Sequence, residues 1–226
     1  MRRFCLILAA LSLAASGGCQ QGKGRSPSEV YWDANRAFER GDYETAAADY
    51  QEYIEVRPGD TEGRLGLGKS LLILGRADEA TDHLWVAYDA KPRDDSRADL
   101  LAEAMYQAGQ TQKLVEFLRE RTEQPGRVQD YLTLGRYAAL CGLPDEAEPA
   151  LLTAAKLDRG VSLEPQLALA DFYESIGANE MALERYRMAL WIDRENEEIK
   201  ERVRALGEIP GPTFAIIPEE AGGGTP

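Results

Sequence analysis

The most chemically versatile side chains in this sequence are three cysteines and a single histidine, and their positions decide what they can do. Cys5 and Cys19 lie in or beside an apolar amino-terminal run, so only Cys141 belongs to the part that can fold. One cysteine cannot build an internal disulfide framework. His83 has no second histidine or nearby cysteine with which to share a metal ion. We therefore predict no metal site, a surface position for His83, and Cys141 as a small, partly buried apolar residue.

The carboxylates are numerous, but their spacing is typical of solvated helix faces. Pairing with Lys or Arg explains runs such as Glu195 and Glu197 without catalysis. Gly66 and Gly68 follow no strand, which excludes a phosphate-binding loop. No nucleophile, base and orienting partner come together. We predict that the protein is not an enzyme and needs no cofactor, and a ligand-sensing or catalytic role is the least favoured alternative.

The amino terminus has the three parts of a secretory signal. Arg2 and Arg3 precede the apolar residues 4–15, and small residues lead from there to Cys19. Because a membrane-spanning helix needs roughly 20 apolar residues, we interpret residues 1–18 as a removable signal peptide. Residues 19–27 have no apolar periodicity, which predicts a flexible tether.

Gly17 and Gly18 directly before Cys19 resemble the lipobox of bacterial lipoproteins, in which the cysteine is lipidated and becomes the first mature residue. The resemblance implies lipidation of Cys19 and a lipid anchor in the periplasm-facing cell envelope, at the inner or the outer membrane. The alternative is ordinary secretion with cleavage among residues 14–16. Both interpretations export the chain.

The rest of the chain repeats itself at intervals of 34, 34, 33 and 35 residues. A glycine marks each repeat. Two further positions recur in every repeat, one seven residues before the glycine and one five residues after it, and we call each set of equivalent residues a column. The glycines are Gly41, Gly75, Gly109, Gly142 and Gly177; the columns are Ala34, Gly68, Ala102, Gly135 and Ala170, and Ala46, Ala80, Leu114, Ala147 and Ala182. The glycine can end a helix in the left-handed conformation, and small columns let two helices approach closely.

This pattern resembles the tetratricopeptide repeat (TPR), a pair of antiparallel helices. The match covers five repeats, at residues 27–60, 61–94, 95–127, 128–162 and 163–196. The resemblance implies an all-α fold, a right-handed TPR superhelix of about five helix-turn-helix repeats within residues 28–207. A polar-faced capping helix at residues 196–206 closes it.

TPR proteins commonly hold an extended peptide or a helix on the concave face built by the first helix of each repeat, and the resemblance carries that role to this chain. The helical period assigns one set of side chains to this face. The set comprises Tyr31, Asn35, Phe38, Leu65, Lys69, Leu72, Ile73, Asp99, Glu103, Tyr106, Leu132, Arg136, Ala139, Leu167, Asp171 and Glu174. Apolar residues dominate early and acids later, which predicts a partner segment that is apolar at one end and basic at the other. The alternative is that the aromatic residues pack against neighbouring repeats.

Two regions depart from the pattern. The third repeat has Leu114 and Arg121 where TPR sequences favour alanine, which predicts looser packing. The tail at residues 208–226 is rich in Pro and Gly and is predicted to be disordered. Its apolar stretch 214–217 is a candidate docking element that could instead fold back over the last helix or occupy the concave groove.

The charge limits the partners. Lys and Arg number 26 against 39 Asp and Glu, which gives a formal net charge of −13 and disfavours nucleic acid. No small-molecule substrate is evident. The sequence therefore predicts a membrane-anchored scaffold or assembly factor that binds protein partners in the cell envelope; the alternative is a secreted, soluble TPR binding module.

Overall fold

The computed structural model describes residues 24–123 and 126–222. The predicted signal peptide at residues 1–18 and the lipidation site Cys19 lie outside the described residues. Within the described part, the chain forms helices and no strand. No described helix is long and apolar enough to span a bilayer.

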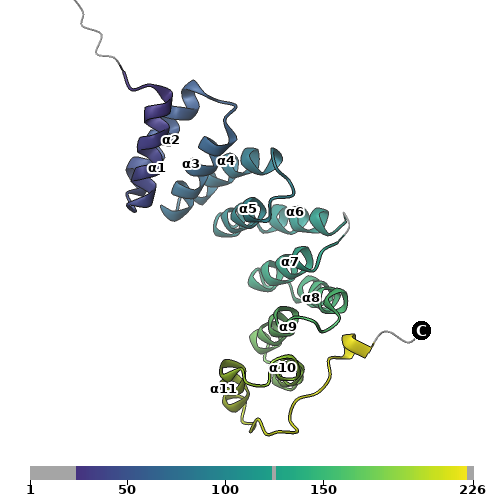
Figure 1. Cartoon of the computed structure of the whole chain (residues 1–226). Coiled ribbons are helices and arrows are strands. Elements are labelled where there is room, and N and C mark those ends of the chain that lie inside the picture. Colours follow the sequence, from purple (N-terminus) through teal and green to yellow (C-terminus); the bar gives the residue numbers. More distant parts are fainter. Residues whose placement is uncertain (1–23, 124–125, 223–226) are drawn as a thin grey trace, which may run out of the picture.

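The helices form five consecutive pairs followed by a single helix and a short 3-10 turn (Figure 1). Their bounds are α1 (Pro27–Glu39), α2 (Tyr43–Val56), α3 (Thr61–Ile73), α4 (Ala77–Asp89), α5 (Asp95–Gln107), α6 (Thr111–Glu123), α7 (Val128–Leu140), α8 (Pro144–Asp158), α9 (Glu164–Ser175), α10 (Asn179–Ile192), α11 (Glu197–Ala205) and η1 (Glu219–Gly222). The five predicted repeats and the capping helix are confirmed.

Each pair is joined by a turn that the sequence encodes locally. Gly75, at φ +73°, takes the left-handed conformation after α3, and the equivalent glycines of the other four repeats do the same. Carboxylates cap the starts of α2, α3 and α5; at α3, Asp60 accepts a hydrogen bond from the Gly63 amide at 2.8 Å. The turn and the cap end one helix and start another without help from tertiary contacts.

The start of α1 reaches into the predicted tether. Ser26 and Glu29 form a reciprocal capping box, and Pro27 occupies the first turn. Arg25 donates to Asp49 of α2 at 2.7 Å. The described end of the tether, from Arg25 onward, is therefore fixed to the first repeat.

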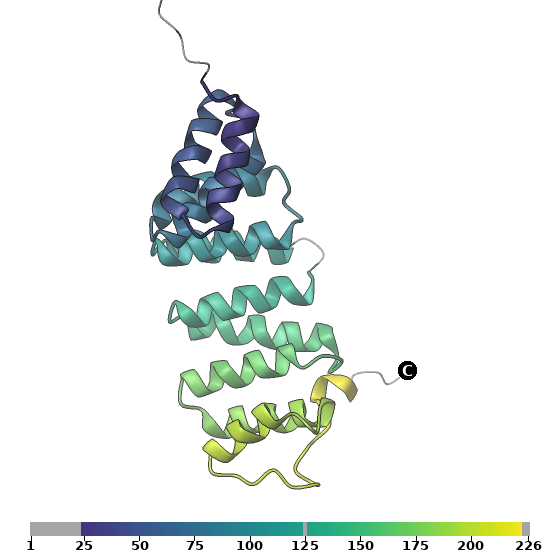
Figure 2. The same ribbon diagram turned by 60° about the vertical axis from the view of Figure 1, so that its left-hand side comes forward.

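The pairs stack into an elongated, curved solenoid (Figures 1 and 2). The odd-numbered helices line one side of it, and α1 contacts α3, α3 contacts α5, and α7 contacts α9. The even-numbered helices lie on the other side. The odd-numbered helices therefore form the concave face, as predicted, and the even-numbered helices form the convex face.

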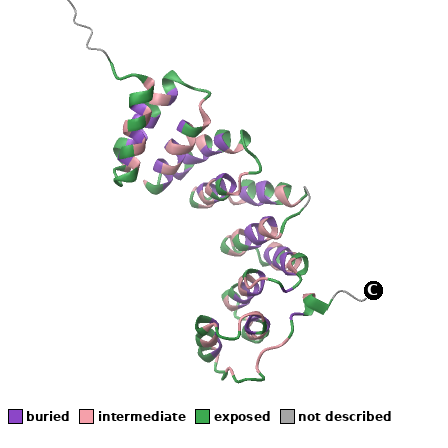
Figure 3. Cartoon of the chain, in the orientation of Figure 1, coloured by how far each residue is buried: buried purple, intermediate pink, exposed green. Residues whose placement is uncertain are grey.

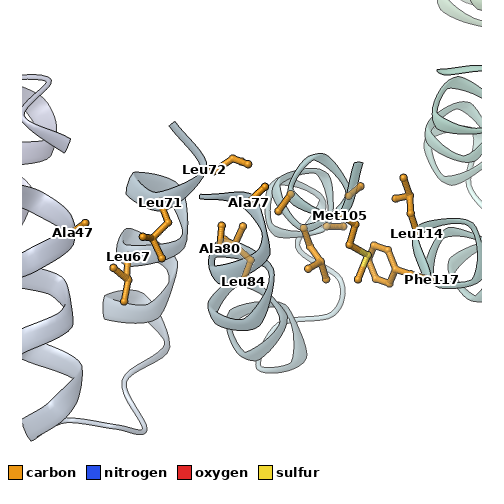
Figure 4. Close-up of a cluster of buried hydrophobic side chains, with 14 of the residues drawn as sticks. Ala47, Leu67, Leu71, Leu72, Ala77, Ala80, Leu84, Met105, Leu114 and Phe117 are labelled. Carbon is orange, nitrogen blue, oxygen red and sulfur yellow. The ribbon is translucent and has the colours of Figure 1, made fainter. Parts of the chain in front are cut away.

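Buried residues occur in every repeat, mainly on the parts of the helices that face neighbouring helices (Figure 3). They form two clusters, one from repeats one to three (Figure 4) and one centred on repeats four and five. The two clusters meet on α7, where Leu134 belongs to the first and Leu132 to the second. The solenoid thus has two adjoining cores.

Close helix approach depends on the small columns. A Cβ atom added at Gly135 of α7 would lie 2.5 Å from Cγ of Leu151 in α8, so the glycine is required for the spacing of this pair. Repeat three has Ala102 and the fully buried Leu114 instead. The backbones of α5 and α6 approach each other least among the five pairs, while the leucines Leu101 and Leu114 of these helices remain fully buried.

The carboxy-terminal tail follows a defined path over residues 208–222, which corrects the prediction of a disordered tail. It turns back from α11 and runs along α10 towards α8 (Figure 1). The Ile216 amide donates to the Arg187 carbonyl of α10 at 3.1 Å. Of the three interpretations of residues 214–217, folding back over the last repeat is the one that the structure shows, and the tail does not enter the concave groove.

Candidate functional site: a concave groove crossed by polar rungs

The aromatic residues predicted for the concave face are half-buried. Tyr31 packs against Tyr50 and Tyr53, with ring centroids 6.0 and 4.9 Å apart. Phe38 packs edge-to-face on Tyr43 of α2 at 5.3 Å. Much of the surface of these two rings therefore stabilises the first repeat, as the alternative interpretation proposed.

Two leucines predicted for the groove belong to the core. Leu132 is 1% exposed and Leu72 is 8% exposed. Leu132 is covered because α9 packs closely against α7 and brings Leu169 into the same cluster. The helical period predicts which side chains lie on the concave side of the solenoid. Whether such a side chain is accessible depends on how closely the next repeat packs against its helix. Neither leucine can contact a partner.

Polar contacts link successive odd-numbered helices along the concave side, and we call these contacts rungs. Glu62 of α3 accepts from Arg97 of α5 at 2.6 Å. The Tyr137 hydroxyl of α7 donates to Glu103 of α5 at 3.0 Å. Arg136 of α7 pairs with Glu164 of α9 at 3.2 Å. The rungs fix the spacing of neighbouring repeats and occupy polar groups that would otherwise face a ligand.

The predicted acidic end of the groove is closed by the capping helix. Arg202 of α11 pairs with Asp171 at 2.9 Å and Glu174 at 3.3 Å. The same guanidinium donates to the Tyr186 hydroxyl at 3.2 Å. These acids already have one cationic partner in a solvent-exposed pair, and their role in receiving the basic end of a ligand stays a prediction.

Asn35 is also engaged internally. Its amide donates to the Tyr31 carbonyl at 2.7 Å and accepts from the Tyr50 hydroxyl at 2.8 Å. The accessible part of the groove therefore begins after α1, at α3.

The open part of the groove lies on α3 and α5. Lys69 and Asp99 form no hydrogen bond or ion pair with any residue in the described part of the chain. Leu65 and Tyr106 are partly exposed beside them, and the Tyr106 ring packs on Tyr137 at 5.8 Å. We define the concave groove as Leu65, Lys69, Asp99 and Tyr106 with the Glu103–Tyr137 rung. This subset of the predicted residues combines an apolar wall with one free cation and one free anion.

Asp99 is the electrostatically unusual member of the groove. Partial desolvation raises the pKa of its carboxyl group although the residue is exposed, the negative charge of Asp95 one turn earlier raises it further, and the charges of Arg121 and Arg136 oppose the rise. Both effects disfavour the ionised form. A cation placed against Asp99 would reverse them, so this position favours a basic ligand group.

Other candidate residues play no part in the groove. His83 is partly buried, and its Nδ1 lies 3.3 Å from Arg64. Cys141 is partly buried against the first core, in keeping with the predicted packing role. No cluster of metal-ligating side chains occurs within the described residues.

Sequence reasoning missed the residues that close the groove. Tyr137 and Arg202 sit beside the predicted concave positions, and nothing in the repeat period distinguishes them from solvent-facing residues. Glu103, Arg136 and Asp171 occupy equivalent positions, but their partners Tyr137, Glu164 and Arg202 do not, so the repeat period carries no signal for the rungs.

No protein-family model and no curated protein sequence matches the chain. Solved structures do. A tetratricopeptide repeat protein from Parabacteroides merdae matches with a TM-score of 0.63 at 15% identity, over 81% of this chain and 73% of that one. The fold is a TPR solenoid.

Two further solved structures agree. TTC0263, a TPR protein of Thermus thermophilus, gives a TM-score of 0.52 at 22% identity over 80% of this chain and 98% of its own. YrrB, described as a TPR protein with an unusual peptide-binding site, gives 0.54 at 18% identity over 79% and 92%. These matches confirm the predicted fold class. At such identities the fold is what is shared, so the ligand must be argued from this chain's own side chains.

Proposed function

We propose that this TPR solenoid is an envelope scaffold that binds a protein segment in the concave groove while a lipid on Cys19 anchors it to the membrane. The observation that carries the proposal is the pair Lys69 and Asp99, whose charges remain unmatched on a face where neighbouring charges are paired in rungs. Unmatched opposite charges beside apolar surface suit a ligand that brings the complementary charges.

The chemistry of the groove specifies the segment. Leu65 and Tyr106 favour an apolar or aromatic side chain, and Asp99 favours a basic one. Lys69 lies one repeat earlier and favours an acidic group. The expected ligand is therefore an extended segment with an apolar residue flanked by one acidic and one basic residue, bound across repeats two to four.

Site-specific crosslinking tests the groove. A photoreactive residue at Lys69 should capture a partner in cells, and the same residue at Lys113 of α6 serves as the convex control. The substitution Asp99→Asn should abolish capture at position 69, and Asp82→Asn of α4 should not. Equal capture at positions 69 and 113, or capture that survives Asp99→Asn, would refute the groove.

The anchor rests on the lipobox resemblance at Cys19 and has its own test. Incorporation of labelled palmitate and membrane fractionation should both depend on Cys19, and Cys19→Ala should release or misprocess the chain. Two or more acyl chains suffice for stable anchoring, at about 0.8 kcal/mol for each buried methylene. A soluble, unlabelled wild-type protein after export would favour the secreted binding module instead, while leaving the groove in place.

A further inference from the structure

The tail occupies a slot on the convex side of repeats four and five, on the opposite side of the solenoid from the concave groove (Figure 1). The slot is formed by α10, the start of α9 and the loop that follows α8. The tail enters it as an extended segment from Phe214 and leaves it at η1. The tail contacts the slot as a bound peptide would contact a receptor. Three of these contacts show which side chains the slot can bind.

The first contact recognises a carboxylate. Arg185 of α10 donates to one oxygen of Glu220 at 2.7 Å, and Gln166 of α9 donates to the other oxygen at 3.1 Å. Arg185 is 8% exposed and Gln166 is 1% exposed. Buried donors that lose an acceptor are costly, so the slot requires an acidic group at this point.

The second contact recognises a proline. Pro218 is buried against Gly160, where an added Cβ atom would lie 2.9 Å from Cβ of Pro218. The preceding residue, Arg159, has φ +57° and is the sole non-glycine residue with a positive φ in the described part of the chain. Arg159 is the left-handed C-cap of α8, and its amide donates to the Ala155 carbonyl. The cap brings the following Gly160 beneath Pro218.

The third contact recognises an aromatic residue and its backbone. The Arg187 guanidinium lies 5.4 Å from the centre of the Phe214 ring and donates to the Phe214 carbonyl at 2.9 Å. The Ile216 amide donates back to the Arg187 carbonyl. The slot therefore accepts an aromatic residue, a proline four residues later and a glutamate two residues after that.

We propose that this convex slot is a second peptide-binding site, which the tail closes in cis and which opens to a partner segment with the same aromatic, proline and glutamate spacing. The receptor side chains Arg185 and Gln166 are buried beneath the docked tail, whereas the tail itself shows the exposed Ile217 and an η1 turn without a buried residue. The tail is also joined to α11 by a segment in which residues 211–213 are exposed.

The tail acts as a tethered competitor. A short flexible connection gives a tethered ligand an effective concentration of about millimolar. A free segment of equal intrinsic affinity therefore binds wild-type protein weakly and binds a protein with a weakened tail strongly. The ratio of the two affinities measures how tightly the slot is closed.

The probe is a fluorescent peptide with the sequence of residues 211–222. Its binding is compared in the wild-type full chain and in the full-chain variant Phe214→Ala/Glu220→Ala, in which the tail is weakened. We expect the peptide to bind the variant at least tenfold more tightly. Adding Arg185→Met should abolish that binding, whereas Arg119→Met on α6 should leave it unchanged, and a probe with Gln in place of Glu220 should not bind.

Absence of binding to the weakened-tail variant, or binding that survives Arg185→Met, would overturn the proposal. Circular dichroism and thermal melting must show that each variant folds. A second measurement uses wild-type protein, in which millimolar unlabelled peptide should accelerate hydrogen exchange at the Ile216 amide; unchanged exchange would also count against the site. Wild-type dimers that Arg185→Met abolishes would assign the slot to a second copy and overturn its assignment to a partner. None of these results depends on the concave groove.

Discussion

Repeat three and its neighbour repeat four have the same glycine turn and first helices of equal length, but they differ in how their two helices are held together. In repeat four, α7 and α8 approach closely because Gly135 leaves room for Leu151. In repeat three, Leu114 fills the space between α5 and α6 and keeps the two backbones apart.

Charge compensates for the wider spacing. Arg121 of α6 pairs with Asp95 at 3.0 Å and Asp130 at 2.7 Å, and Arg127 pairs with the same two acids. This network links α5, α6 and α7 by charge, in a repeat whose two helices are not held close together by small residues. The comparison shows that the register of a repeat is set by its turn, whereas the strength of the pairing is set by side chains that can vary from one repeat to the next.

The largest expected effect is at Gly135. Replacement by Val places atoms against Leu151 and 3.2 Å or less from the Ala147 carbonyl, so we expect a loss of about 3 kcal/mol in the free energy of unfolding. Ala102→Val at the equivalent position should cost clearly less, because α5 and α6 lie farther apart. Chemical denaturation measures both. Equal losses would remove the distinction between the two repeats.

The ion network of Arg121, Arg127, Asp95 and Asp130 should contribute to stability at repeat three. Asp130 is 5% exposed, and Asp130→Asn leaves Arg121 with Asp95 as its remaining anion. We expect a loss of about 2 kcal/mol, below the usual cost for a buried pair because Arg127 is about half exposed. Asp145→Asn on the surface of α8 is the matched control and should change the denaturation midpoint little.

The turns should not distinguish the repeats. Gly75 and Gly109 have φ values of +73° and +67°, and an added Cβ atom meets nothing within 4 Å at either position. The cost of Gly75→Val is therefore a backbone cost of about 1 to 2 kcal/mol, and Gly109→Val should match it. Thermal melting of the two variants tests this. A large difference between them would show that repeat three also differs in its turn.

The smallest effect is the pH dependence of repeat three. Hydrogen bonds from Arg127, together with the charges of Arg127 and Arg121, lower the pKa of Asp95. A carboxyl group with a lowered folded-state pKa contributes stability that is complete above its ordinary pKa and disappears as the pH falls through the lowered value. Asp95→Asn should flatten this acid-side loss of stability in pH titrations of the unfolding midpoint. An unchanged slope would mean that the network contributes nothing to acid stability.

The fold could be predicted well from the sequence because the TPR architecture depends on features within each repeat. Glycine at the turn, small residues at two helical offsets and a capping carboxylate each act within one repeat. The wider spacing of α5 and α6 follows from a replacement that the sequence also shows, because Leu114 stands where the other repeats have alanine.

The candidate site was predicted less well because it depends on distances between repeats. Leu132 and Leu65 have equivalent sequence positions, yet one is buried and the other is partly exposed. Asp171 and Asp99 are both acids on the concave side, yet Arg202 neutralises one and leaves the other free. The docked tail depends on Arg185 and Gln166, which lie 35 and 54 residues from Glu220 along the chain. No local pattern could reveal that pairing.

The two cores adjoin on α7 and α8, where Leu134 and Ala150 belong to the first and Leu132 and Leu151 to the second. Because a linear array is stabilised by contacts between neighbours, we expect unfolding that begins at α1 to reach this junction before it reaches the second core. The second core would then persist with α9, α10 and the docked tail in place. Unfolding of the first three repeats alone would release an extended chain of up to about 3.3 Å per residue beside a folded carboxy-terminal half.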